Sequence, residues 1–546
     1  MRRLAVAAAL LVLTAVPARA ASVDLPFTTS DGVRLATTIS GAAPLTARPT
    51  IVEFSPYGRN SGTFAPSNAY NFLLVQIRGT GDSDGQFDAL GPRTQQDVAE
   101  VLRWACAQSW SNGSLALNGF SASAITIYNS LHLPLPCVKA AVLKSGTFEL
   151  YRDLIYPGAI NNLVPDAGVM GLIGAPALEQ SPARLQRAPA SGLDTLSGLL
   201  GTGLNGLTHD TLDAYWRQRG FQGDVNHLPI LMIDGFFDVE SRGAFQAYQA
   251  LRGDGARLEV IGAHDSAPKG TDGGVGDMQA WFDHYLRGAA LPDQPRVRLW
   301  MSDGDREDDL AGDFVRYDGA DWPVPGTTWQ TLHLGAGGTL TAARSTPAAR
   351  ESYPQVSSFA LNSDPYNTAI AGGAGLNALT TAFPVLSDMT VAQQLGRSYT
   401  TAPLKAPLLS AGPAAVDLRL ASTAPQTNIW VVISDVWPNG TPHPIAAGRL
   451  NSDFPRIDRA RSLRDPQSGA IVQPYGRFDQ RDPAPLGRAR TYHVEIWPIG
   501  NRFRTGHRIR LTVLGSSDAS KPSAPALDTI TVGGRSGSRL LLPVLP

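Results

Sequence analysis

Short apolar runs alternate with segments of helical periodicity between residues 30 and 263. The runs lie at residues 51–54, 72–77, 115–117, 138–143, 230–233 and 258–261. Runs that are apolar at nearly every position predict strands buried on both faces, as in a parallel sheet. Between the second and third runs, Val98, Val101, Leu102 and Ala105 repeat with helical spacing. This alternation predicts an α/β fold.

The alternation stops at residue 151, and the pattern changes again near residue 295. Residues 151–226 hold helix-forming residues with Gly and Pro but no strand-like run, which predicts a helical insertion over the sheet. From Pro295 on, short alternating strands such as 416–420 and 493–497 are separated by turn signals. That pattern predicts an antiparallel sandwich or jelly roll. The expected domains are therefore 21–150 with 227–294, then 151–226, then 295–546.

Residues 1–20 have the pattern of a secretory signal peptide. Arg2 and Arg3 are basic, residues 5–16 are apolar but short for a membrane span, and Ala18-Arg19-Ala20 fits a small-x-small cleavage site. We expect cleavage after Ala20 and a secreted or periplasmic protein. No other stretch approaches the roughly 18 apolar residues of a span, so we expect no membrane association after cleavage.

The chain has two cysteines, Cys106 and Cys137. Export permits a disulfide, and both thiols are available for one. Cys106 would end the helix before one strand, and Cys137 would precede the next strand. Both would then lie at the same edge of the sheet, so we expect a bridge between them.

Charge and motifs exclude several classes of function. Lys and Arg number 46 and Asp and Glu 47, so the chain lacks the basic excess of many nucleic-acid-binding proteins. There is no phosphate-binding P-loop and no His-Glu-x-x-His zinc motif. The acidic segment 303–309 lacks the glycine at the sixth position of an EF-hand loop. We therefore expect no cofactor, no metal and no nucleic-acid partner, and the oligomeric state stays open.

Two serines are candidates for the nucleophile of acyl transfer. Ser83 lies in Gly81-Asp82-Ser83-Asp84-Gly85, the literal G-x-S-x-G pattern, but its neighbours are acidic and no helix follows at once. Ser121 lies in Gly119-Phe120-Ser121-Ala122-Ser123, between the run at 115–117 and a predicted helix. A nucleophile at a strand-to-helix turn requires that context. The context favours Ser121, with helix capping as its alternative role and a structural turn as the role of Ser83.

Position along the chain narrows the candidates for the general base and for the carboxylate that orients it. Of nine histidines, His264 directly follows the strand predicted at 258–261, where loops at the carboxyl edge of a sheet carry functional groups. The carboxylate should follow the preceding strand. Asp234 and Asp238 both do so, and the residues alone leave the choice between them open.

Several segments together resemble the family of X-Pro dipeptidyl-peptidases, cocaine esterase and related α/β-hydrolases. The segments that carry the resemblance run almost end to end along the chain: 31–35, 55–58, 78–85, 97–104, 110–113, 119–121, 235–238, 501–503 and 506–510.

The resemblance implies a triad of Ser121, Asp238 and His264. It also implies an oxyanion hole made by the Tyr57 hydroxyl and the Ala122 amide. It implies an α/β-hydrolase fold with a helical cap at 151–226 and a C-terminal jelly roll at 295–546.

The implied activity is that of a serine hydrolase cleaving an ester or amide through an acyl-enzyme. Family members that hydrolyse amino esters carry an acidic residue three positions after the nucleophile, where this chain has Ala124. The extra N-terminal domain usual in X-Pro dipeptidyl-peptidases also has no room here. Both departures favour acyl esters over short peptides as substrates. The alternatives are X-Pro dipeptidyl-peptidase activity and a catalytically decayed binding protein. No role can be assigned to Ser123.

Overall fold

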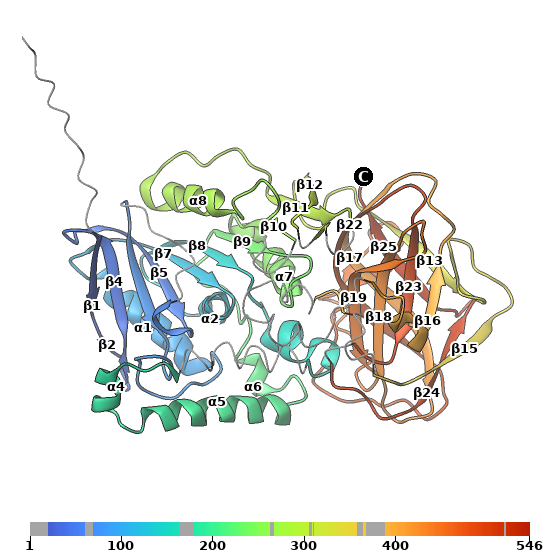
Figure 1. Cartoon of the computed structure of the whole chain (residues 1–546), viewed down its shortest axis with the longest axis horizontal. Coiled ribbons are helices and arrows are strands. Elements are labelled where there is room, and N and C mark those ends of the chain that lie inside the picture. Colours follow the sequence, from blue (N-terminus) through green and yellow to red (C-terminus); the bar gives the residue numbers. More distant parts are fainter. Residues whose placement is uncertain are drawn as a thin grey trace, which may run out of the picture.

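The computed structural model describes residues 20–60, 69–162, 174, 178–262, 267–304, 308–309, 311–357, 364–366, 388–517 and 520–546. Two parts lie side by side along the long axis, an α/β part that continues to Gly319 and a β-rich part after it (Figure 1). Residues 1–19 of the expected signal peptide lie outside the described residues. In the described part of the chain, no helix has the length and apolarity needed to cross a membrane.

One sheet runs through the whole α/β part. Its strands follow in the order β1 (Ala20–Asp24), β4 (Thr37–Ala42), β6 (Asn71–Gln76), β5 (Arg48–Ser55), β7 (Ser111–Phe120), β8 (Val138–Lys144), β9 (Ile230–Asp234), β10 (Arg257–Val260), β11 (Val297–Ser302) and β12 (Phe314–Gly319). The strands from β6 to β11 are parallel, and each of the six apolar runs forms one of them. The predicted parallel sheet is confirmed.

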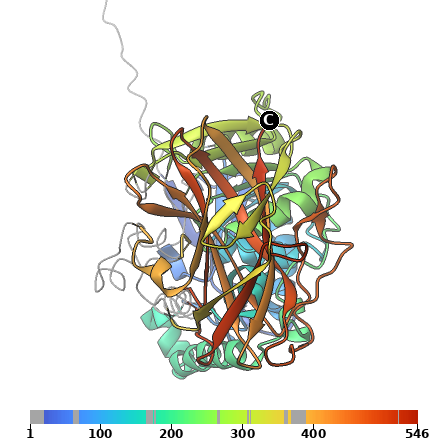
Figure 2. The same ribbon diagram turned by 90° about the vertical axis from the view of Figure 1, so that its right-hand side faces the viewer.

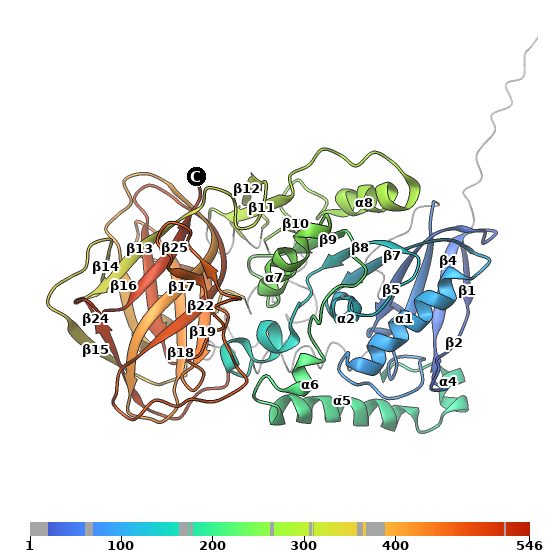
Figure 3. The same cartoon turned by 180° about the vertical axis from the view of Figure 1, so that it is seen from behind.

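Helices cover both faces of this sheet. Three of them, α1 (Pro92–Cys106), α2 (Ala122–Ser130) and α7 (Ser241–Leu251), pack on the face that carries Val52 and Leu73. Helix α8 (Val275–Arg287) packs on the opposite face, which carries Ile51 and Phe72. Figure 3 shows α1 in front of the strands. Because neighbouring residues of one strand enter opposite cores, the strands are apolar at nearly every position.

The sheet extends past the boundary that the sequence suggested at residue 294. Strand β11 pairs in parallel with β10, and β12 then pairs antiparallel with β11. In β11, buried Val297, Leu299 and Met301 alternate with half-buried Arg298 and Trp300. That alternation resembles the antiparallel strands downstream, so the sequence pattern did not show that residues 297–302 pair with the parallel sheet, and the domain bounds stay a prediction.

The segment between β8 and β9 is helical, as predicted. It contains a π-helical turn, η2 (Tyr151–Ile155), the 3-10 turn η3 (Pro157–Ala159), and the helices α4 (Pro182–Arg187), α5 (Ser191–Thr208) and α6 (Ala214–Arg217). Helix α5 lies along one edge of the molecule (Figure 1). A Cβ added to Gly198 would lie 2.9 Å from the carbonyl oxygen of Phe87, so glycine lets α5 approach that loop closely. The role of the segment 151–226 as a cap over the site stays a prediction.

The second part consists mainly of antiparallel strands, which face the viewer in Figure 2. They are β13 (Thr328–Gly335), β14 (Thr339–Thr341), β15 (Ala349–Pro354), β16 (Arg397–Thr400), β17 (Leu408–Ser422), β18 (Asn428–Val436), β19 (Pro442–Asn451), β22 (Arg490–Phe503), β23 (Arg508–Leu514), β24 (Leu527–Val532) and β25 (Arg539–Val544). Strand β17 pairs with β22, β24 and β25, and β18 pairs with β19 and β23. The sheet-rich character is as expected, and the jelly-roll topology remains a prediction.

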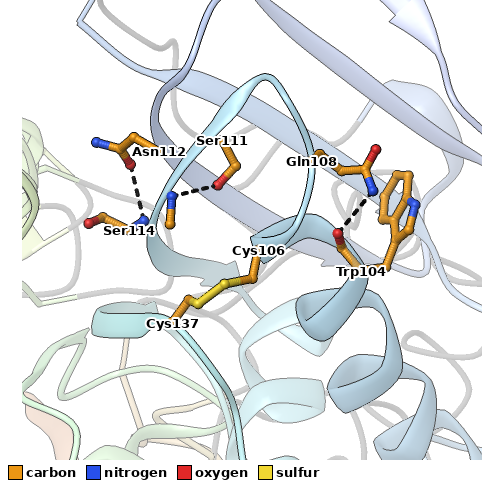
Figure 4. The surroundings of a disulfide bond; sticks show 8 residues. Trp104, Cys106, Gln108, Ser111, Asn112, Ser114 and Cys137 are labelled. Atoms are coloured by element: carbon orange, nitrogen blue, oxygen red, sulfur yellow. Dashed lines mark hydrogen bonds between the residues drawn. A yellow bond between two sulfur atoms is a disulfide. The ribbon is translucent and has the colours of Figure 1, made fainter.

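Cys106 and Cys137 are joined by a disulfide (Figure 4). Cys106 ends α1, and Cys137 directly precedes β8. The carbonyl oxygen of Cys137 also accepts a hydrogen bond from the backbone N–H of Leu115 in β7. The bridge therefore fastens α1 to the edge of the sheet where β8 begins.

Candidate active site

Ser121 stands between β7 and α2 in a strained backbone conformation. Its φ is 54° and its ψ is −124°, a region that residues with a side chain rarely adopt. The turn requires small neighbours: a Cβ on Gly119 would lie 2.7 Å from the backbone of Ala124, and one on Gly146 would lie 2.6 Å from the Cβ of Ala124. Ser121 is half-buried, whereas every residue of α2 is buried. The turn therefore lifts one hydroxyl out of a packed element.

Ser83 is held inside the structure instead. It is fully buried, and its hydroxyl donates to the carbonyl oxygen of Gln76 at 2.6 Å. The same hydroxyl accepts from the backbone N–H of Ala36 at 2.8 Å. Both interactions fasten the loop after β6 to the strand beside it, which fits the structural role expected for Ser83.

Tyr57 places its hydroxyl at the N-terminus of α2. The backbone N–H of Ala122 donates to this oxygen at 3.1 Å, and the Ser121 side chain is also hydrogen-bonded to it. Burial raises the pKa of Tyr57 to about 12, with the charges of Glu240 and Glu53 adding to the rise. The phenol therefore stays protonated at neutral pH. The Tyr57 O–H and the Ala122 N–H are two donors beside the candidate nucleophile.

Asp234 and Asp238 lie together at the carboxyl end of β9. Both are fully buried, and their carboxyl groups are in hydrogen-bonding contact. Asp234 Oδ1 accepts from the backbone N–H of Gly235 at 2.7 Å, and Asp238 Oδ1 accepts from that of Glu240 at 3.0 Å. Burial and the neighbouring Asp238 charge raise the pKa of Asp234 well above its ordinary value. The two candidates for the carboxylate are therefore parts of one pair.

His264 lies outside the described residues. The chain that leads to it is described as far as Gly262, whose carbonyl oxygen accepts from the backbone N–H of Phe237 at 2.7 Å. One residue earlier, the N–H of Ile261 donates to the carbonyl oxygen of Asp234 at 2.6 Å. The strand before His264 thus runs beside the loop that carries Asp238.

The site lies against the β-rich part through contacts that the sequence did not reveal. Arg242, on the first turn of α7, is fully buried and pairs with Asp153 of η2 at 2.5 Å and with Glu495 of β22 at 3.1 Å. A Cβ on Gly500 would lie 2.2 Å from the ring of Phe236, so glycine lets β22 pack on the loop after β9. The β-rich part therefore braces the loop that holds Asp238.

Glu240 is the functional candidate that sequence reasoning missed. It is buried beside Tyr57, close enough for its charge to raise the pKa of the phenol. Its position two residues after Asp238, in the same loop, was the available signal.

Among the described residues, no group of three or more His, Cys, Asp and Glu side chains could hold a metal ion.

Known families match both parts of the chain. Residues 31–264 match the X-Pro dipeptidyl-peptidase (S15) family, and residues 290–536 match the X-Pro dipeptidyl-peptidase C-terminal non-catalytic domain. The chain belongs to the S15 family. Two similar proteins are each 23% identical to this chain. Cocaine esterase of a Rhodococcus species aligns over 89% of both chains, and a protein of Mycobacterium bovis named as a serine esterase aligns over 88% of this chain and 84% of its own.

Solved structures of the same fold cover almost the whole chain. A CocE/NonD family hydrolase from Staphylococcus aureus has a TM-score of 0.74 at 18% identity, covering 96% of this chain and 93% of its own. An α-amino acid ester hydrolase has a TM-score of 0.74 at 18% identity, covering 96% and 97%. The chain thus has the CocE/NonD-like hydrolase fold, and its C-terminal part matches the non-catalytic domain of the family.

Proposed function

We propose that this protein is an exported serine hydrolase that cleaves acyl esters through an acyl-enzyme on Ser121. The observation that carries the proposal is the strained, half-exposed Ser121 with the Tyr57 hydroxyl and the Ala122 amide beside it. A hydroxyl raised on a tight strand-to-helix turn next to two hydrogen-bond donors is the arrangement that acyl transfer needs.

In the proposed mechanism, His264 accepts the proton of the Ser121 hydroxyl as Oγ attacks the carbonyl carbon. The negative charge passes to the carbonyl oxygen, where Tyr57 and the Ala122 amide donate hydrogen bonds to it. His264 then gives its proton to the leaving alcohol as the carbon–oxygen bond breaks. Water repeats the two steps to release the acid. Asp238 orients the imidazole and stabilises its charged form.

Two arguments favour esters over amides. An alkoxide is a better leaving group than an amide nitrogen, so it needs less help from His264 as an acid. The helical segment 151–226 would, as a cap, enclose an apolar pocket of the kind that takes a small acyl group. Relatives named as esterases, among them cocaine esterase, support the same choice.

A second candidate, X-Pro dipeptidyl-peptidase activity, is favoured by one observation. The buried carboxyl group of Glu240 lies near Tyr57, and buried Glu53 is a second acidic residue close enough to act on the same phenol. Negative charge beside the reacting carbonyl would attract the free α-amino group of a dipeptide substrate. Ala124, in the position where amino-ester hydrolases are expected to carry an acidic residue, speaks against it.

Labelling with a fluorophosphonate tests the proposed nucleophile. We expect Ser121 to be labelled in the wild-type protein and in Ser83→Ala, and no labelling in Ser121→Ala. Label on Ser83 would overturn the assignment, and no label on any residue would support a catalytically decayed binding protein.

The substrate class is tested by comparing kcat/KM for a p-nitrophenyl acyl ester and an X-Pro p-nitroanilide, the latter with and without N-acetylation. We expect the ester to be preferred and N-acetylation to matter little. A strong preference for the free amine, lost both on acetylation and in Glu240→Gln, would establish the peptidase instead.

Sequencing the N-terminus of the exported protein tests cleavage after Ala20.

A further inference from the structure

Two buried carboxyl groups in contact at the candidate site raise the question of which one carries a proton. Asp234 and Asp238 are both fully buried at the end of β9. Asp234 Oδ1 is satisfied by the Gly235 N–H, but no N–H or O–H donor in the described part of the chain reaches its Oδ2. The Asp238 carboxyl group lies in hydrogen-bonding contact with that of Asp234. An ionised Asp234 would leave one oxygen buried without a donor and next to another negative charge.

Among the residues that the structure describes, the other groups around Asp234 do not offset such a charge. Those that act on it most strongly are Asp238 and Glu240, both acidic. Tyr128 of α2 is close enough for the charge of Asp234, after burial, to raise the pKa of its phenol. Two carboxylates in contact inside a protein share a proton because their like charges cannot both be stabilised. Asp238 accepts the Glu240 N–H and, unlike Asp234, has no buried oxygen left without a hydrogen-bond partner, so it is the better-placed member to stay ionised.

We propose that Asp234 is protonated and donates a hydrogen bond to Asp238, which it holds as the ionised, correctly oriented carboxylate of the site. Asp234 is thus a positioning residue that acts through Asp238 and does not touch the substrate. The inference rests on the proposed function, in which Asp238 orients His264. The Asp234 O–H reaches Asp238 from the end of β9, and the Glu240 N–H reaches it from the loop that carries Asp238. They also disperse its charge, which limits how far that charge raises the pKa of the histidine.

The matched variants are Asp234→Asn and Asp234→Val. Asparagine keeps an oxygen for the Gly235 N–H and offers an N–H to Asp238 at every pH, so it copies a protonated Asp234. Valine is similar in size and removes the donor. The readout is the pH profile of kcat/KM for a p-nitrophenyl ester, whose acidic limb reports the ionisation of the base.

We expect Asp234→Asn to keep the acidic limb in place and kcat within about 3-fold of wild type. Asp234→Val should move the limb to higher pH by about half a unit or more and lower kcat roughly 10-fold with little change in KM. An ionised Asp234 would give the opposite result, because Asp234→Asn would then remove a negative charge and move the limb to lower pH. That shift, or a wild-type profile in a folded Asp234→Val, overturns the proposal.

An infrared measurement separates this proposal from the proposed function. The difference spectrum of wild type minus Asp234→Asn at pH 8 should contain the C=O band of a protonated carboxylic acid. Absence of the band overturns the assignment of the proton, whatever the activity. If the band is present but fluorophosphonate leaves Ser121 unlabelled, the carboxyl pair stands and the proposed function fails.

Discussion

The loop at Gly81–Gly85 and the turn at Gly119–Ser123 carry the same Gly-x-Ser pattern but differ in every physical respect that matters for chemistry. In the loop, the Ser83 hydroxyl is buried and has a donor and an acceptor of its own. In the turn, Ser121 is half-buried, strained, and beside the Tyr57 hydroxyl. A satisfied hydroxyl stabilises a fold, whereas one held in a strained turn beside two donors is available to react.

Strain at Ser121 also needs support from its surroundings. A φ in this region costs on the order of 1–3 kcal/mol for a residue with a side chain. Glycines at 119 and 146 allow close packing around Ala124, and the backbone N–H of Ser121 donates to the carbonyl oxygen of Lys144 at 2.9 Å. The loop with Ser83 is braced differently, by Arg78, which pairs with Asp97 and Asp31. Several segments that carry the family resemblance thus hold the scaffold rather than the reacting groups.

Removing the candidate nucleophile should have the largest effect on activity and tests the comparison of the two serines most directly. Ser121→Ala should lower kcat by at least about 10³-fold, because the step that forms the acyl-enzyme is lost. Thermal melting of the variant should remain close to wild type, since alanine keeps the Cβ and the backbone conformation of the turn. Ester hydrolysis near the wild-type rate would contradict the assignment.

The disulfide tests whether the opposite end of the sheet is only structural. Replacing Cys106 and Cys137 together by Ser opens a bridge with a sequence separation of 31 residues. The free energy of unfolding should fall by about 3 kcal/mol, measured by denaturant titration, with kcat unchanged in the folded protein. Two titratable thiols in the unreduced, exported wild-type protein would show that the bridge is absent.

Tyr57→Phe sharpens the comparison by removing one donor beside Ser121. We expect a loss of about 10²-fold in kcat for ester and amide substrates alike, because both pass through an oxyanion. Labelling of Ser121 should persist at a reduced rate. An effect confined to KM would assign Tyr57 to substrate binding instead.

Ser83→Ala should have the smallest effect, and it should lower stability without lowering reactivity. The Ala36 N–H loses its acceptor in a buried place, which should lower stability by about 1–3 kcal/mol. Once folded, the variant should react with fluorophosphonate at the wild-type rate. A stable Ser83→Ala variant that loses labelling would reverse the roles of the two serines.

The pattern of apolar positions predicted the parallel sheet and the helical segment after β8, because burial on both faces leaves a strand few polar positions. It did not show that β11 pairs with the parallel sheet, because half-buried Arg298 and Trp300 alternate with buried residues there. Arg298 is accommodated there by ion pairs with Glu259 and Asp277, which are distant in sequence. Such partners can only be recognised once the chain is folded.

For the candidate site, the sequence by itself determined that Ser121 stands between a strand and a helix with small neighbours. Its residues alone left Asp234 and Asp238 as alternatives and gave no reason to single out Arg242. Only the tertiary structure decided that the two aspartates are one buried pair, that Tyr57 reaches the start of α2, and that Arg242 connects α7 to β22. The reason is physical: local sequence fixes backbone preference and periodicity, but burial, charge coupling and hydrogen bonding between side chains depend on which strands the fold brings together.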